Sequence, residues 1–113
     1  MQAQLTQTLG RFTRELRQEL GDELVSLILY GSHARGDAKP DSDVDLFVTL
    51  RHAPEALQKR VYDVAYRVMW DADFSHVFSL YIADVQYQER LRRHRASFWE
   101  NVEREGRILW PSA

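Results

Sequence analysis

The sequence contains no cysteine, and this absence excludes three kinds of site. Without thiols the chain forms no disulfide framework, binds no zinc through thiolates and has no cysteine nucleophile. Carboxylates and four histidines remain as metal ligands. The histidines are scattered along the chain without the spacing of a metal site.

Long hydrophobic runs and a strong excess of one charge are also missing. No segment approaches the roughly 20 apolar residues that cross a bilayer, and the first residues lack the features of a secretory signal. The chain has 15 Lys and Arg against 17 Asp and Glu, which gives no global attraction to nucleic acid. We therefore expect a cytoplasmic protein with no membrane contact and no nucleic acid as direct ligand.

The length and composition predict a single ordered domain over residues 1–113. A domain usually has about 100–150 residues, so a chain of 113 residues has no room for two cores. Apolar residues make up 44% of the chain, which is enough for one core. The three tryptophans, with Tyr66 and Phe98, are expected to pack there, and Trp99 beside Phe98 leaves an aromatic side chain for an interface.

The spacing of apolar residues predicts helices and strands in alternation. An apolar residue at every third or fourth position predicts helices over 5–20 and 54–70. Short apolar runs predict strands over 24–30, 44–50, 77–82 and 107–110, and Asp84 caps a last helix that runs to Gly106. The fold class is therefore α/β (α+β), a small mixed β-sheet covered by helices.

The basic run Arg90–Arg95 lies on the last predicted helix. Acidic residues share that helix, so we expect a solvated face, with contact to RNA or an acidic partner as the alternative.

The loop between the first two predicted strands carries the most informative pattern, with Gly31-Ser32 at its start. Glycine beside a small hydroxyl residue lets the backbone approach a ligand closely, and the amides of the following turn can point at phosphate oxygens. Asp43 and Asp45 follow, two positions apart in a strand, so both side chains project from one face. Their repulsion is relieved by a hard cation such as Mg²⁺, which prefers oxygen ligands.

These residues resemble the signature of the minimal nucleotidyltransferases of the polymerase-beta-like superfamily. Gly31-Ser32, ten intervening residues and Asp43-Val44-Asp45-Leu46 match that signature, as do Gly36 and Ser42 between them. The resemblance implies the nucleotidyltransferase (polymerase-beta-like palm) fold.

The resemblance also implies an activity, the transfer of a nucleoside monophosphate from ATP to a hydroxyl group. Asp43 and Asp45 are then the metal ligands for one or two Mg²⁺ ions. Arg35 either contacts a phosphate or is a solvated loop residue. The implied nucleotide-binding residues are Gly31, Ser32, Arg35, Gly36 and Ser42.

The sequence departs from the family at the third carboxylate, which the family places on a neighbouring strand. Residues 75–82 contain no Asp or Glu. Asp73, just before this strand, is the best substitute as third catalytic residue, with Asp71 and His76 behind it. The alternative is that Asp73 only caps a turn.

The resemblance further suggests a partner protein. Stand-alone members of the family resemble the antitoxin of a toxin–antitoxin pair, whose toxin is a helical HEPN-family ribonuclease that is adenylylated on a tyrosine. The alternative is a degenerate binding module that neutralises the toxin by complex formation alone, which the missing third carboxylate favours.

Overall fold

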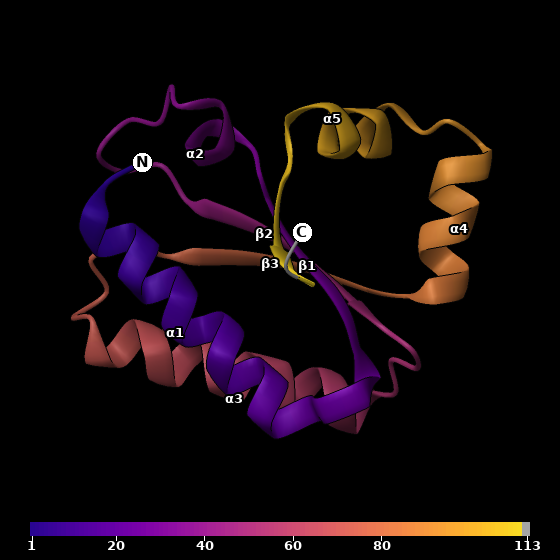
Figure 1. Ribbon diagram of the computed structural model, residues 1–113, viewed down its shortest axis with the longest axis horizontal. Coiled ribbons are helices and arrows are strands. Elements are labelled where there is room, and N and C mark those ends of the chain that lie inside the picture. Colours follow the sequence, from indigo (N-terminus) through magenta and orange to yellow (C-terminus); the bar gives the residue numbers. More distant parts are fainter. Residues whose placement is uncertain (112–113) are drawn as a thin grey trace.

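A four-stranded sheet with the order β3-β2-β1-β4 organises the protein in the computed structural model, which describes residues 1–111 (Figure 1). β1 pairs antiparallel with β2 and β4, and β3 pairs parallel with β2. This arrangement confirms the predicted mixed sheet. The last two residues of the predicted domain lie outside the described residues. The strands are β1 (Leu24–Tyr30), β2 (Val44–Leu50), β3 (Phe78–Asp84) and β4 (Arg107–Trp110).

The long helices α1 (Ala3–Leu20) and α3 (Glu55–Asp71) cover one face of the sheet (Figure 1). The short 3₁₀ helix η1 (Gly21–Glu23) joins α1 to β1. α3 forms the crossover between the parallel strands β2 and β3, which a tight hairpin could not connect. The predicted apolar stripe of the first helix is confirmed, because its members are all buried. They are Leu5, Leu9, Phe12, Leu16 and Leu20.

The opposite face of the sheet packs against α5 (Ser97–Glu105), and α4 (Val85–Arg93) lies beside α5 and contacts β2 and β3. Side chains alternate between the two faces along β2, so Leu46 lies in the core with α1 and α3 while Phe47 contacts Trp99 of α5. Both Leu46 and Phe47 are fully buried. This second face is the one from which Asp45 projects.

One prediction for the C-terminal part of the chain is wrong. The single helix expected between Asp84 and Gly106 is two helices, α4 and α5, separated at residues 94–96, where Arg95 has a φ of +50°. α4 has no buried residue, whereas α5 buries Trp99 against the sheet. We infer that the packing of α5 determines the path of the chain here. Asp84 is the expected N-cap, since its carboxylate accepts a hydrogen bond of 2.7 Å from the Tyr87 amide.

The expected core packing of aromatic residues is confirmed in part and wrong in part. Trp99 is buried and Phe98 packs against it and its neighbours. Trp70 and Tyr66 instead project from α3 into solvent, with 62% and 55% of their surface exposed. Helical spacing places them together but on the side of α3 that turns away from the sheet.

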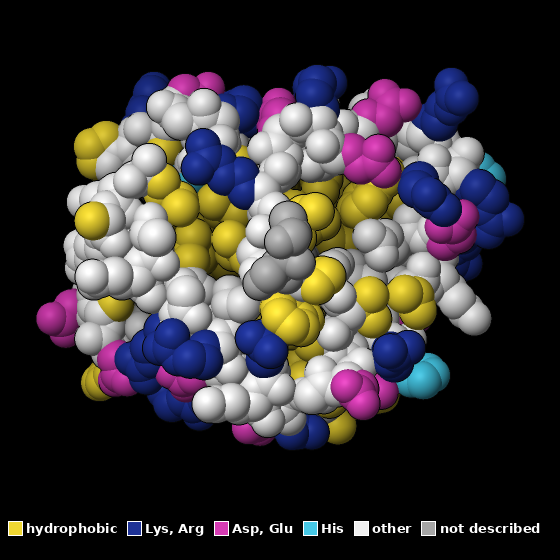
Figure 2. Space-filling model, viewed as in Figure 1, with side chains coloured by type: hydrophobic (Ala, Val, Ile, Leu, Met, Phe, Trp, Pro, Cys, Tyr) yellow, Lys and Arg dark blue, Asp and Glu magenta, His cyan; other side chains and the backbone are white. Residues whose placement is uncertain are grey.

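The basic run Arg90–Arg95 lies at the surface, as predicted, and is mixed with acidic side chains. Arg92 forms an ion pair of 2.7 Å with Glu89. Lys, Arg, Asp and Glu side chains intermingle around the rim of the face shown in Figure 2, while hydrophobic side chains gather toward its middle. Among residues 1–111, no helix has the length and apolar composition needed to span a bilayer.

Candidate active site

The two predicted metal ligands lie at the start of β2. Asp45 is partly buried between Tyr30 of β1 and Ser79 of β3, its register partners on either side. Asp43 is exposed and comes immediately before the strand. Because Asp43 and Asp45 are two positions apart, both carboxylates belong to the face covered by α5.

Gly31 fits against the Asp45 carboxylate in a way that no other residue could. Its φ of 76° and ψ of −158° lie in a region essentially restricted to glycine. A Cβ atom built on Gly31 would lie 2.2 Å from Oδ2 of Asp45. The backbone that precedes Ser32 is therefore packed directly against the Asp45 carboxylate. The close approach to a ligand that the sequence predicts at this glycine stays a prediction.

The following residues form the expected helical turn, α2 (Ser32–Arg35). The amides of Ala34 and Arg35 donate to the Gly31 carbonyl over 3.1 Å. Gly36 ends the turn in the left-handed conformation, with φ of 86° and its amide 2.9 Å from the Ser32 carbonyl. These bonds give the predicted phosphate-binding loop a defined backbone at its start.

The rest of the loop is held by Ser42. The Ser42 hydroxyl accepts a hydrogen bond of 2.9 Å from the Lys39 amide, and its carbonyl lies 3.1 Å from Nε2 of His33. Ser42 thus links the end of the loop to α2 immediately before Asp43. This orders the segment that presents the carboxylate pair.

Arg35 is exposed and forms two ion pairs, and its contact with a phosphate stays a prediction. Its guanidinium forms ion pairs with Asp37 over 3.2 Å and with Glu105 at the end of α5 over 3.0 Å. The second pair joins the loop to the helix that covers the Asp45 face. A phosphate group that contacted Arg35 would compete with these two carboxylates.

Electrostatics at Asp45 favour the arrival of a cation. Burial, and then the negative charge of Asp43, raise the pKa of Asp45 above its usual value, while His33 and Arg35 oppose this rise. Burial, and then the charge on Asp45, raise the pKa of Tyr30 to about 12. Two carboxylates with this mutual repulsion form an oxygen donor set that suits Mg²⁺. The residues present therefore fit a divalent cation.

A third carboxylate is not brought to this pair. Asp73 is exposed in the turn after α3, with a φ of 53° and its amide bonded to the Trp70 carbonyl. Within residues 1–111, no three His, Asp or Glu side chains gather closely enough to hold a metal ion. Ser79 is the β3 residue in register with Asp45. The catalytic role of Asp73 stays a prediction.

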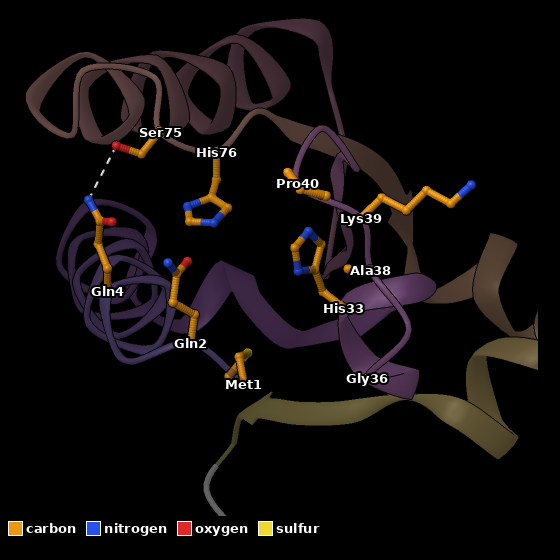
Figure 3. A pocket seen from close by; sticks show the side chains of 10 residues that line it. All are labelled: Met1, Gln2, Gln4, His33, Gly36, Ala38, Lys39, Pro40, Ser75 and His76. Atoms are coloured by element: carbon orange, nitrogen blue, oxygen red, sulfur yellow. Dashed lines mark hydrogen bonds between the residues drawn. The ribbon is translucent and has the colours of Figure 1, made fainter.

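Sequence reasoning missed the pairing of His33 with His76. Their ring centroids are 5.8 Å apart although the residues are far apart in sequence, so no local spacing could predict it. Both rings line a cavity of about 480 Å³ between the loop and the start of α1, where Gln4 donates to the Ser75 hydroxyl (Figure 3). Burial and the neighbouring His33 lower the pKa of His76. His76 precedes β3 in phase with Phe78, on the side of the sheet opposite Asp45.

Comparison with known families and curated proteins identifies relatives of the chain. Residues 9–108 match the family described as "Nucleotidyltransferase domain". Two proteins of Methanocaldococcus jannaschii are similar, both named "Putative protein adenylyltransferase". The first is 45% identical over 51 residues, which are 45% of this chain and 35% of that protein. The second is 27% identical over 91% of this chain and 96% of its own length.

Solved structures show the same fold at low sequence identity. A toxin–antitoxin complex with AMP-PNP is similar with a TM-score of 0.57 and 18% identity, over 91% of this chain and 73% of the matched chain. A complex of a tri-AMPylated Shewanella oneidensis HEPN toxin with its MNT antitoxin is similar with a TM-score of 0.51 and 15% identity, over 94% and 72% of the two chains.

Proposed function

The chain belongs to the nucleotidyltransferase domain family, and from this premise we propose that it is a Mg²⁺-dependent transferase of AMP from ATP to a hydroxyl acceptor. The observation that carries the proposal is the contact of Gly31 with Asp45. A backbone position open only to glycine is packed against one of two mutually repelling carboxylates. Backbone conformations restricted to glycine cluster at functional sites.

The residues of the candidate active site have separate roles in the proposed reaction. Asp43 and Asp45 would hold the Mg²⁺ ions, which when bound neutralise charge on the triphosphate and on the departing pyrophosphate. The backbone at Gly31 and Ser32 orients the phosphates beside Asp45. The acceptor oxygen forms a bond to the α-phosphorus, the bond from that phosphorus to pyrophosphate breaks, and the hydroxyl proton passes from the acceptor oxygen to water.

We further propose that the acceptor is a tyrosine of a HEPN-family toxin and that this chain is its antitoxin. Two lines of support meet here. The two M. jannaschii relatives carry the name "Putative protein adenylyltransferase", and the S. oneidensis antitoxin of similar fold is in complex with a tri-AMPylated HEPN toxin. A protein acceptor is also compatible with Asp43, whose side chain is exposed immediately before β2.

A second function has its own supporting observation. Ser79 lies beside Asp45 in the sheet, where a carboxylate would complete a three-ligand site. A chain that lacks this ligand could act as a binding module that retains the nucleotide and the partner without transfer. Its inhibition of the toxin would then depend on complex formation alone.

Intact-protein mass spectrometry tests the transfer directly. The chain is incubated with a HEPN-family protein, ATP and Mg²⁺, and we expect added AMP on the HEPN protein. Asp43→Ala and Asp45→Ala should each abolish the adduct while leaving the complex intact. Asp41→Ala removes an exposed carboxylate of the same loop and should retain it. An adduct that forms as well with Asp43→Ala as with the parent would refute the metal assignment.

Ser79→Asp distinguishes the two functions. If the chain is an enzyme slowed by the missing ligand, this substitution should accelerate AMP transfer about tenfold or more, because a well-placed acid or base contributes 10²–10⁴-fold. Ser79→Asn has a similar shape without the charge and should leave the rate unchanged. Absence of any adduct in the parent, despite a stable complex and measurable ATP binding, would favour the binding module.

A further inference from the structure

The outer side of α3 carries four exposed aromatic residues in a row. Tyr62, Tyr66 and Trp70 recur every four positions and therefore lie one above another along the helix, and Phe74 follows in the next turn. Ring centroids are 6.1 Å apart for Tyr66 and Trp70 and for Trp70 and Phe74. Their exposed fractions are 51%, 55%, 62% and 41% in chain order. We call these four residues the α3 ladder.

The area of the α3 ladder is large for a surface that contacts only water. A whole aromatic side chain has about 200 Å² to bury, so the exposed fractions correspond to roughly 400 Å² of accessible aromatic surface. A stable interface buries about 800 Å² on each partner. The ladder alone supplies about half of that, and aromatic residues are the common centre of such interfaces.

Charges beside the ladder are arranged so that the surface is complementary to itself. On the side toward α1, Arg67 forms an ion pair of 2.7 Å with Glu15, so it is already neutralised. Lys59 and Asp73 lie at the two ends, each seven residues from Tyr66, and both are exposed. Lys59 pairs with Asp63 of its own helix over 3.2 Å, but both side chains are largely exposed and such a surface pair is weak enough to exchange. If the ladders of two chains pack antiparallel about Tyr66, Lys59 of each chain lies opposite Asp73 of the other chain.

We propose that a second copy of this chain docks on the α3 ladder in an antiparallel, two-fold symmetric dimer. Tyr66 packs on the partner's Tyr66, Tyr62 packs on the partner's Trp70, and Lys59 faces the partner's Asp73. A two-fold interface requires such a self-complementary patch. Since α3 covers the sheet face opposite Asp45, the dimer leaves both carboxylate sites facing outward. This inference does not depend on the proposed activity.

Sedimentation velocity of the full chain over a range of micromolar concentrations tests the dimer. The parent should sediment as a species of twice 13.3 kDa. Tyr66→Lys brings two cations together at the two-fold axis and should raise the dimer dissociation constant at least about 100-fold, as loss of a central aromatic does. Ile108→Lys, at a residue 60% exposed on β4, is the matched control and should leave the dimer unchanged.

Charge exchange at the ends tests the antiparallel register. Lys59→Glu and Asp73→Lys should each weaken the dimer a few-fold, and the double variant should restore it. Lys59 lies about 18 Å of helix from Asp71, the last residue of α3, and Asp73 follows in the next turn, so restoration cannot come from contact within one chain. Circular dichroism of each variant verifies that it is folded.

Three outcomes would overturn the proposal. A parent chain that stays monomeric at every concentration excludes the dimer. A dimer that Tyr66→Lys leaves intact uses another surface. A monomeric parent whose ladder becomes protected from solvent only when the HEPN protein is added assigns the ladder to that partner instead.

Discussion

Replacement of Gly31 by alanine should have two effects, a loss of fold stability and a displacement of the Asp45 carboxylate. The backbone at Gly31 lies in a conformation that costs other residues about 1–3 kcal/mol. In addition, the new Cβ atom would stand 2.2 Å from Oδ2 and 3.1 Å from Cγ of Asp45. These contacts are with the carboxylate of a short side chain in a strand, so the Asp45 carboxylate must move. We expect loss of metal-dependent ATP binding together with the loss of stability.

Gly21→Ala is the matched control for this experiment. Gly21 also has a positive φ, of 54°, but a Cβ atom there meets nothing within 4 Å. We therefore expect both variants to unfold at lower urea concentration than the parent, each by about 1–3 kcal/mol. Only Gly31→Ala should lose ATP binding, measured calorimetrically at a temperature where both variants are folded.

The result that refutes this reasoning is a Gly31→Ala variant that binds ATP and Mg²⁺ as the parent does. Such a result would mean that the Asp45 carboxylate can leave its position without loss of the site. Equal loss of binding in Gly21→Ala would instead trace the effect to stability alone.

Three other predictions test parts of the structure. Burial and Asp43 raise the pKa of Asp45 in the folded state, so the metal-free fold loses stability as the pH rises through that pKa. In EDTA at pH 7, Asp45→Asn should therefore have a free energy of unfolding in urea up to about 1 kcal/mol higher than that of the parent. This difference should disappear below about pH 4, where Asp45 of the parent is protonated. The ring of Phe47 is fully buried, with its centroid 5.2 Å from that of Trp99, so Phe47→Ala should lower the free energy of unfolding by about 3–5 kcal/mol. A loss below about 1 kcal/mol would contradict the packing of α5 on the sheet. If Arg35 exchanges its carboxylate partners for phosphate, Arg35→Gln should weaken ATP binding about tenfold, whereas Glu105→Gln should leave ATP binding unchanged. Equal weakening by both variants would show that the ion pair between Arg35 and Glu105 acts by holding the loop in place.

Periodic burial explains why most of the fold could be predicted. The stripe from Leu5 to Leu20 and the run from Leu24 to Tyr30 each follow from local spacing, and both elements form within two residues of their predicted bounds. The break at Arg95 could not be predicted, because the basic residues before it are good helix formers. It is the burial of Trp99 against Phe47, a contact distant in sequence, that requires α5 to start anew.

Part of the candidate site could likewise be predicted from local spacing in the sequence, and part of it could not. Asp43 and Asp45 lie two positions apart in one strand, so their common face is a local property that the sequence predicts. The identity of Ser79 as the neighbour of Asp45 depends on the register of two strands joined by a long crossover. The exposure of Trp70 likewise depends on which side of α3 faces the sheet, and its apolar residues alone allow either orientation.

Calorimetric titration of ATP, with and without Mg²⁺, tests most directly whether Asp43 and Asp45 form a metal-dependent nucleotide site. The parent should bind ATP in the presence of Mg²⁺ and lose most of this affinity in EDTA. The double variant Asp43→Asn and Asp45→Asn should bind ATP equally weakly in both conditions. Binding of ATP by the parent that is the same with Mg²⁺ and with EDTA, and is retained in the double variant, would contradict the account.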